Sequence, residues 1–68
     1  MKIERYDKNG IQLRIGDYLL RKDGVIFKVV FNPTLLAYGI VDKYSQFYFL
    51  DNWNKKDWEV KTYEELYK

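Results

Sequence analysis

Three glycine-bearing turns in the first 24 residues leave room only for short extended segments between them. Asn9-Gly10 and Asp23-Gly24 are typical of tight hairpin turns because both residues of each pair tolerate a positive φ, and Gly16-Asp17 interrupts the chain between them. The intervals are too short for the crossover helices that parallel strands require. This spacing therefore predicts an antiparallel β meander.

The segment at residues 25–31 is the strongest strand candidate, because β-branched and aromatic residues dominate it. Val25, Phe27, Val29 and Phe31 alternate along it and are expected to share one face. Ile11, Leu13 and Ile15 alternate in the same way, which predicts a short half-buried strand or an extended arm. Further extended segments are expected at residues 18–22, 35–42, 47–50 and 57–61, with Gly39 marking a bulge or a close approach of two backbones.

About five short strands joined by turns favour closure into a small barrel, which removes exposed sheet edges. We therefore predict one all-β domain over residues 1–68, a five-stranded antiparallel SH3-like barrel; an OB-type barrel is the alternative, although such chains are usually longer. At the end of the chain, Thr62 and Glu65 have the spacing of a capping box. Residues 62–68 thus predict a short helical turn, with a frayed tail as the alternative.

The composition argues against an enzyme. The 68 residues include no cysteine and no histidine, and the sole serine, Ser45, falls in an expected turn without a base beside it. Most of the acidic residues also fall in turns, where a carboxylate usually accepts backbone hydrogen bonds; these are Asp7, Asp17, Asp23, Asp42 and Asp51. We predict no catalytic residue, no metal site and no cofactor.

Several segments resemble a known family. Asp-Lys-Asn-Gly at residues 7–10 and Ile-Gly-Asp-Tyr-Leu at residues 15–19 resemble the opening of YopX-like phage and prophage proteins. Residues 27–30, 38–41 and 49–50 look like the middle strands of that family, and residues 58–60 like its closing segment, whereas residues 61–65 depart from it. The resemblance implies a small β domain encoded by a phage or an integrated element, and it implies no catalytic residues.

The aromatic residues exceed what a small core can hold. Phe27, Phe31, Phe47, Phe49 and Trp58 are expected to form the core. Surplus aromatic rings and nearby lysines give the candidate partner-binding set, namely Trp53, Tyr44, Tyr48, Tyr38, Tyr18, Lys55 and Lys56. Such rings favour protein recognition, because tyrosine and tryptophan dominate interface hot spots.

Two alternatives remain open for these rings. They could stack on the bases of a single-stranded nucleic acid whose backbone Lys28, Lys43, Lys55 and Lys56 would hold. They could also simply cover a small core, with their hydroxyl groups in water. The net charge is only +2, with acidic and basic residues interspersed, so the composition favours a protein partner over nucleic acid.

The expected partner is an unidentified host or phage protein, and a homodimer is a further alternative. The N-terminus is charged and lacks the apolar core of a secretory signal. No apolar run approaches the roughly 20 residues that span a bilayer. We therefore expect a soluble cytoplasmic protein that does not enter the membrane.

Overall fold

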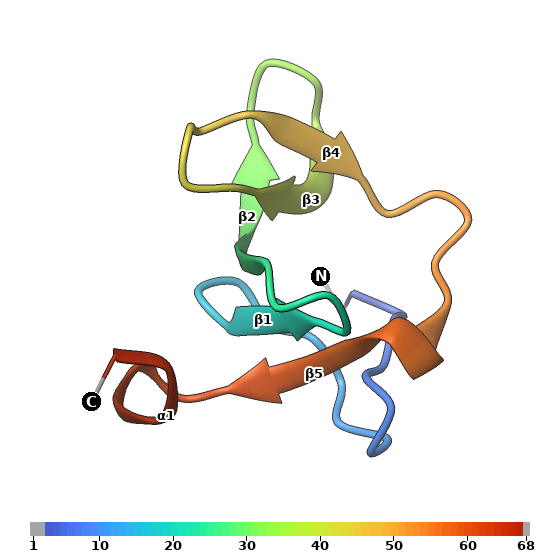
Figure 1. The fold of residues 1–68 in the computed structure, drawn as a ribbon. Coiled ribbons are helices and arrows are strands. Elements are labelled where there is room, and N and C mark those ends of the chain that lie inside the picture. The colour runs from blue at the N-terminus through green and yellow to red at the C-terminus, as the bar shows by residue number, and fades with distance from the viewer. Residues whose placement is uncertain (1–2, 68) are drawn as a thin grey trace.

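Seven short elements make up the structure, a computed structural model that describes residues 3–67 (Figure 1). The strands are β1 (Tyr18–Arg21), β2 (Ile26–Asn32), β3 (Ala37–Val41), β4 (Phe47–Phe49) and β5 (Trp58–Lys61). A 3₁₀ helix (Lys55–Asp57) precedes β5, and a short helix, α1 (Tyr63–Tyr67), follows it. Neighbouring strands are all antiparallel, and their order across the sheet is β4-β3-β2-β1-β5.

The central strand β2 belongs to both halves of the sheet. Its beginning pairs with β1, where Ile26 lies opposite Leu20, and its remainder pairs with β3, where Asn32 lies opposite Ala37. Figure 1 shows the result: β1 and β5 form one half of the sheet, and β2, β3 and β4 rise across it as the other half. The predicted fold, a small five-stranded antiparallel barrel with a short C-terminal helical turn, is confirmed.

The core lies between these two halves of the sheet. Facing pairs on the inner side of the sheet supply its centre, because Leu19 lies opposite Phe27 and Val29 opposite Ile40. The buried core consists of Ile3, Leu13, Leu19, Phe27, Val29, Ile40 and Leu50. Each such side chain contributes about 1.5–3 kcal/mol by leaving water. The segment before β1 thus supplies two core residues and closes part of the barrel.

Three of the aromatic residues expected in the core lie outside it. The prediction for Phe31 and Phe49 is wrong, since they remain 36% and 52% exposed. The register of β4 places Tyr48 opposite Ile40 and Phe49 opposite Gly39, so Tyr48 is on the side of the core, where it packs on Phe27 but stays 40% exposed, and Phe49 is on the outer side. Phe31 lies at the end of β2, beyond the last buried pair. Phe27 is buried and Trp58 packs against the core. Phe47 is half-buried but lies on the outer side of β4 beside Phe49, so the prediction is wrong for it as well.

The expected alternation before β1 is only partly realised. Leu13 is buried, whereas Ile11 and Ile15 are exposed, and one isolated bridge joins Tyr6 to Gln12. Residues 11–15 therefore belong to an extended arm, which is one of the two predicted alternatives, and not to a strand of the sheet. Val25 precedes β2 and is exposed, so it does not extend the inward row of that strand.

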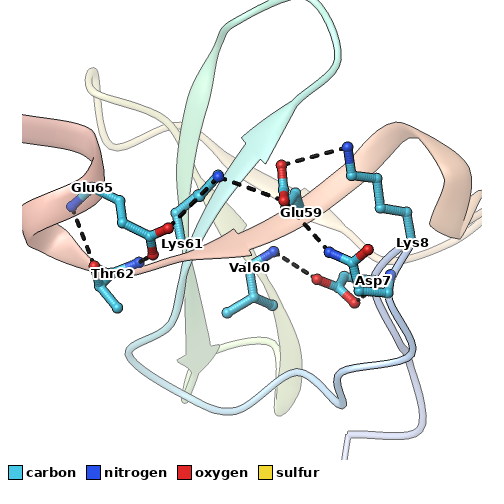
Figure 2. Close-up of polar contacts among 8 residues, drawn as sticks. Asp7, Lys8, Glu59, Val60, Lys61, Thr62 and Glu65 are labelled. Atoms are coloured by element: carbon cyan, nitrogen blue, oxygen red, sulfur yellow. Dashed lines mark hydrogen bonds and ion pairs between the residues drawn. The ribbon is translucent and has the colours of Figure 1, made fainter.

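The N-terminal arm, residues 3–15, lies beside the outer edge of β5 at Asp7 and Lys8. The Lys8 N–H donates to the Trp58 carbonyl at 2.9 Å. The Val60 N–H donates to Asp7 Oδ2 at 2.9 Å (Figure 2). Because β5 is the last strand of the sheet, these bonds satisfy backbone groups that would otherwise face solvent. Asp7 itself is fully buried, so its carboxylate acts as an internal link between the arm and the sheet.

The turn between β2 and β3 contains a strained leucine. Leu36 has a φ of 50°, although residues 35–42 were predicted to be extended, and β3 begins only at Ala37. Asn32 Oδ1 accepts hydrogen bonds from the Thr34 and Leu35 N–H groups and holds this turn in place. Leu36 is also 78% exposed, so its side chain compensates little for the left-handed backbone.

Leu36→Asn should raise the free energy of unfolding by about 1 kcal/mol, because asparagine tolerates the left-handed region better than leucine does. Urea titration followed by tryptophan fluorescence measures this change. Leu35→Asn is the matched control, since Leu35 is exposed but has no positive φ; it should change stability by less than about 0.5 kcal/mol. Equal stability of the two variants would mean that Leu36 carries no backbone strain.

Candidate functional site

An open groove of about 760 Å³ lies against the outer face of the sheet. Tyr18 lies opposite Lys28, and Lys28 lies opposite Val41, so these three side chains share that face. Ile26 shares the face as well, because it lies two residues before Lys28 on β2. Ile26 and Val41 give the groove an apolar floor.

Tyrosines from three separate elements line the groove. Tyr18 comes from β1, Tyr67 from α1 and Tyr44 from the turn between β3 and β4. The ring centroids of Tyr18 and Tyr67 lie 6.2 Å apart in an edge-to-face arrangement, and Tyr63 packs beside both. Tyr44 is 78% exposed and therefore presents most of its ring to solvent.

The helix that carries Tyr67 is held by its own first turn. The Thr62 N–H donates to Glu65 Oε1 at 2.8 Å, and the Glu65 N–H donates to Thr62 Oγ1 at 3.2 Å (Figure 2). The capping box predicted from the sequence is thus present. The hydrogen bond from the Thr62 N–H is the main reason why the pKa of Glu65 lies below its ordinary value.

A row of charges connects α1 to β5 and to the N-terminal arm. Lys61 Nζ lies 3.7 Å from a Glu65 oxygen and 3.5 Å from Glu59, which also pairs with Lys8 at 3.5 Å (Figure 2). Individual exposed ion pairs contribute little, but connected pairs restrict the positions of several elements together. This row helps to keep α1, and with it Tyr67, beside Tyr18.

Two lysines add positive charge to the groove. Lys28 Nζ lies 5.7 Å from the centroid of the Tyr18 ring, and Lys43 Nζ lies 5.2 Å from that of Tyr44. Both are cation–π distances. Within residues 3–67 neither lysine forms an ion pair with a carboxylate. Each ammonium group is therefore close to a tyrosine of the groove and open to an anionic ligand.

The carboxylate that lines the groove, Asp42, is occupied by its own turn. Asp42 Oδ1 accepts hydrogen bonds from the Tyr44 and Gln46 N–H groups at 2.9 and 3.0 Å, and the Tyr48 hydroxyl donates to Oδ2 at 3.2 Å. Partial desolvation by itself would raise the pKa of Asp42, but these hydrogen bonds outweigh it and hold the pKa below its ordinary value. Asp42 thus stays ionised and stabilises the turn that presents Tyr44.

The structure divides the predicted binding set between the groove and other places. Tyr18 and Tyr44 line the groove. Tyr48 packs edge-to-face on Phe27, and Tyr38 packs on Phe31 beside a smaller hollow of about 360 Å³. Lys55 and Lys56 lie in the 3₁₀ helix, outside the residues that line the groove.

Trp53 has a structural environment of its own. Its ring stacks on Trp58 with centroids 4.8 Å apart, and its Nε1 donates to the Tyr6 carbonyl at 2.8 Å. Trp58 in turn packs on Phe27, so a continuous series of rings joins the loop before β5 to the core. Trp53, a member of the predicted binding set, is thereby half-buried, and its Nε1 already has a hydrogen-bond partner.

The groove also contains residues that the predicted set lacked. Tyr67 was not among the predicted binding residues, and Lys28 and Lys43 belonged to the nucleic-acid alternative. The outward position of Lys28 on an otherwise apolar strand was the available signal for this face. No comparable signal connected Tyr67 to Tyr18, because 49 residues separate them in the chain.

The described residues contain neither a metal-binding cluster nor a membrane-spanning helix. Among residues 3–67, no group of three or more acidic side chains is placed to hold a metal ion. In the same part of the chain, no helix has the length and apolar character needed to cross a bilayer.

Comparisons with protein-family models, curated proteins and solved structures found no match. The resemblance to YopX-like proteins therefore stays a prediction.

Proposed function

We propose that this protein is a non-catalytic binding module that recognises an extended segment of a protein partner in the groove on the outer face of its sheet. The observation that carries the proposal is the apolar floor of Ile26 and Val41 lined by tyrosines from three elements. Its volume of about 760 Å³ lies within the roughly 300–1,000 Å³ typical of ligand sites.

The side chains at this site suit peptide recognition. Tyrosine offers a large rigid ring with few rotatable bonds, so ordering it on binding costs little conformational entropy. Tyr18, Tyr44 and Tyr67 come from different elements, so a segment lying along the floor would meet rings at separate points. Recognition of extended peptides between the aromatic side chains of a small barrel is a common binding mode.

A single-stranded nucleic acid is the second candidate, because Lys28 and Lys43 lie next to tyrosine rings on which bases could stack. The charge distribution makes it the weaker of the two. Lys55 and Lys56, which were expected to contribute, lie outside the groove. Two ammonium groups would neutralise few phosphates, and phosphate neutralisation supplies most non-specific affinity for nucleic acid.

The resemblance to YopX-like proteins extends the proposal to a biological setting. We take the chain to be a phage or prophage accessory protein that acts in the bacterial cytoplasm on a host or phage protein, with no cofactor and no catalytic step. The resemblance of residues 7–10 and 15–19 supports this setting. A homodimer remains a second arrangement to test by light scattering.

The binding proposal predicts a specific effect of Tyr44→Ala. The probe is an array of random peptides of about eight residues, which span roughly 26 Å when extended, close to the 25 Å middle dimension of the molecule. The wild-type protein should bind a subset of these peptides, and Tyr44→Ala should weaken their binding about tenfold, as expected when an aromatic ring that contacts the peptide is removed.

The matched control is Tyr6→Ala, which removes an exposed tyrosine outside the groove and should leave peptide binding unchanged. A labelled oligothymidylate is measured beside the peptides at two salt concentrations. The proposal would be wrong if no peptide binds, if Tyr6→Ala weakens binding as much as Tyr44→Ala does, or if the oligothymidylate binds more tightly than every peptide.

A further inference from the structure

The two lysines of the groove differ from several basic residues elsewhere in the fold. Lys8, Lys22 and Lys61 each pair with a carboxylate, and Arg21 binds Asp23 through two nitrogen atoms. Lys28 and Lys43 have no such partner within the part of the chain that the structure describes, even though Asp42 is the direct neighbour of Lys43. Among the described residues, therefore, no carboxylate lies within ion-pair distance of either ammonium group.

The position of Asp42 strengthens this contrast. Both of its oxygens accept hydrogen bonds from its own turn or from Tyr48, and among residues 3–67 it forms no ion pair with either lysine. Asp42 keeps its negative charge, but the two lysines of the groove outnumber it. The groove therefore combines an apolar floor with two ammonium groups and one carboxylate that has other partners. A ligand that brings its own carboxylates would complement this charge, and a basic ligand would be repelled.

The tyrosine contacts indicate where those charges lie. Lys28 Nζ lies over the ring of Tyr18 on β1, and Lys43 Nζ lies over the ring of Tyr44 in the turn between β3 and β4. The apolar floor of Ile26 and Val41 belongs to the same groove. An apolar or aromatic side chain on this floor, with acidic residues near it in the sequence, would satisfy both kinds of surface.

We infer that the groove selects an acidic protein segment in which carboxylates flank an apolar or aromatic residue. This inference rests on the proposed function, since it names the chemistry of the peptide that the groove would bind. Lys28 and Lys43 would contact the carboxylates, and Ile26 and Val41 would receive the apolar side chain.

The test compares three pools of peptides of about eight residues, the length of chain that would cross the molecule when extended. All three contain leucine and phenylalanine at the same positions and differ only in carrying glutamate, glutamine or lysine at the remaining ones. The wild-type protein should bind the glutamate pool about tenfold more tightly than the glutamine pool, as two exposed charge pairs allow. This preference should weaken as salt is added.

Two charge variants locate the effect. Lys28→Glu/Lys43→Glu should reverse the preference in favour of the lysine pool, and Lys28→Gln/Lys43→Gln should abolish it without reversing it. Lys55→Glu/Lys56→Glu is the matched control, because it makes the same change in net charge at exposed residues outside the groove. It should keep the preference for the glutamate pool. All four lysines are exposed, and circular dichroism verifies that each variant is folded.

The outcomes separate this inference from the function on which it rests. Equal binding of all three pools, weakened by Tyr44→Ala, would overturn the acidic preference and leave peptide binding in place. Failure of every pool to bind would overturn both. Reversal by Lys55→Glu/Lys56→Glu would move the charge recognition away from the groove. If an oligothymidylate bound more tightly than the glutamate pool, and Lys28→Gln/Lys43→Gln abolished that binding, the ligand of the groove would be a nucleic acid and not an acidic peptide.

Discussion

Asp7→Ala should lower the free energy of unfolding by about 3 kcal/mol, because it removes the acceptor of three backbone N–H groups at once. Asp7 Oδ1 accepts from the Asn9 and Ile11 N–H groups at 2.9 and 2.8 Å, and Oδ2 accepts from Val60 at 2.9 Å. The carboxylate thus organises its own turn and attaches it to β5. For a domain of this size the loss corresponds to a fall of roughly 12–24 °C in Tm.

Thermal unfolding followed by circular dichroism measures the effect, with two further variants as references. Asp7→Asn keeps the shape and one carbonyl oxygen, so it should fall between the wild type and Asp7→Ala. Asp51→Ala removes a carboxylate from an exposed turn and should change stability by less than about 0.5 kcal/mol. If Asp7→Ala unfolded at the same temperature as Asp51→Ala, the buried carboxylate would not hold the arm to β5.

The same group should make the fold sensitive to acid. Burial alone would raise the pKa of Asp7, but hydrogen bonds from the Val60, Ile11 and Asn9 N–H groups outweigh it and lower the pKa below its ordinary value. Unfolding returns the carboxyl to an ordinary pKa of about 3.9. Its stabilisation is therefore present above about pH 4 and is lost as the pH falls through the lower pKa of the folded state.

Urea titrations between neutral and acidic pH measure this loss. Hydrogen bonds also lower the pKa values of Asp42 and Glu65, and the side chain of Arg21 lowers that of Asp23, so the wild type should lose stability to acid through several groups. The difference in stability between the wild type and Asp7→Asn isolates Asp7, and it should shrink below about pH 4. A difference that stayed constant with pH would contradict the lowered pKa.

Local chemistry explains which parts of the fold could be predicted. The turns at Asn9-Gly10 and Asp23-Gly24 depend on residues next to one another, and so does the capping box of Thr62 and Glu65. Four of the five carboxylates predicted to accept backbone hydrogen bonds in turns do so, namely Asp7, Asp17, Asp23 and Asp42. The prediction is wrong for Asp51, which has no such bond among the described residues. These features need no knowledge of distant parts of the chain.

The orientation of β4 could not be predicted, because its three residues, Phe47, Tyr48 and Phe49, are all aromatic and show no alternation of polarity. Only the register with β3 decides which of them faces inward, and the structure places Tyr48 there. Trp53 illustrates the same limit. Its neighbours are polar, but the atom that accepts its hydrogen bond belongs to Tyr6, 47 residues earlier.

The binding groove was predictable only in part, for a related reason. Tyr18 and Tyr44 were expected to contact a partner because a small core cannot bury so many rings. Their association with Tyr67, and with Lys28 in place of Lys55 and Lys56, depends on how the sheet bends across β2 and where α1 docks. Neither is encoded in a short stretch of sequence.

Gly39→Ala should be the second most damaging single change, lowering the free energy of unfolding by about 2–3 kcal/mol. Gly39 is paired with Val30 on β2 and with Phe49 on β4, and a methyl group there would meet the ring of Phe47 and the backbone carbonyl of Tyr48. A flexible ring can turn aside, but the carbonyl belongs to the adjacent strand. β4 would therefore have to separate from β3.

A double-mutant comparison separates the two obstacles. Phe47→Ala removes the ring, so Gly39→Ala should cost about 1 kcal/mol less in that background than in the wild type. The remaining cost would come from the Tyr48 carbonyl. Amide hydrogen exchange should show faster exchange in β3 and β4, with the pairing of β1 and β5 retained. If Gly39→Ala were as stable as the wild type, β4 could not lie as close to β3 as the structure places it. The position of the turn that joins these two strands, and with it that of Lys43 and Tyr44, would then also be wrong.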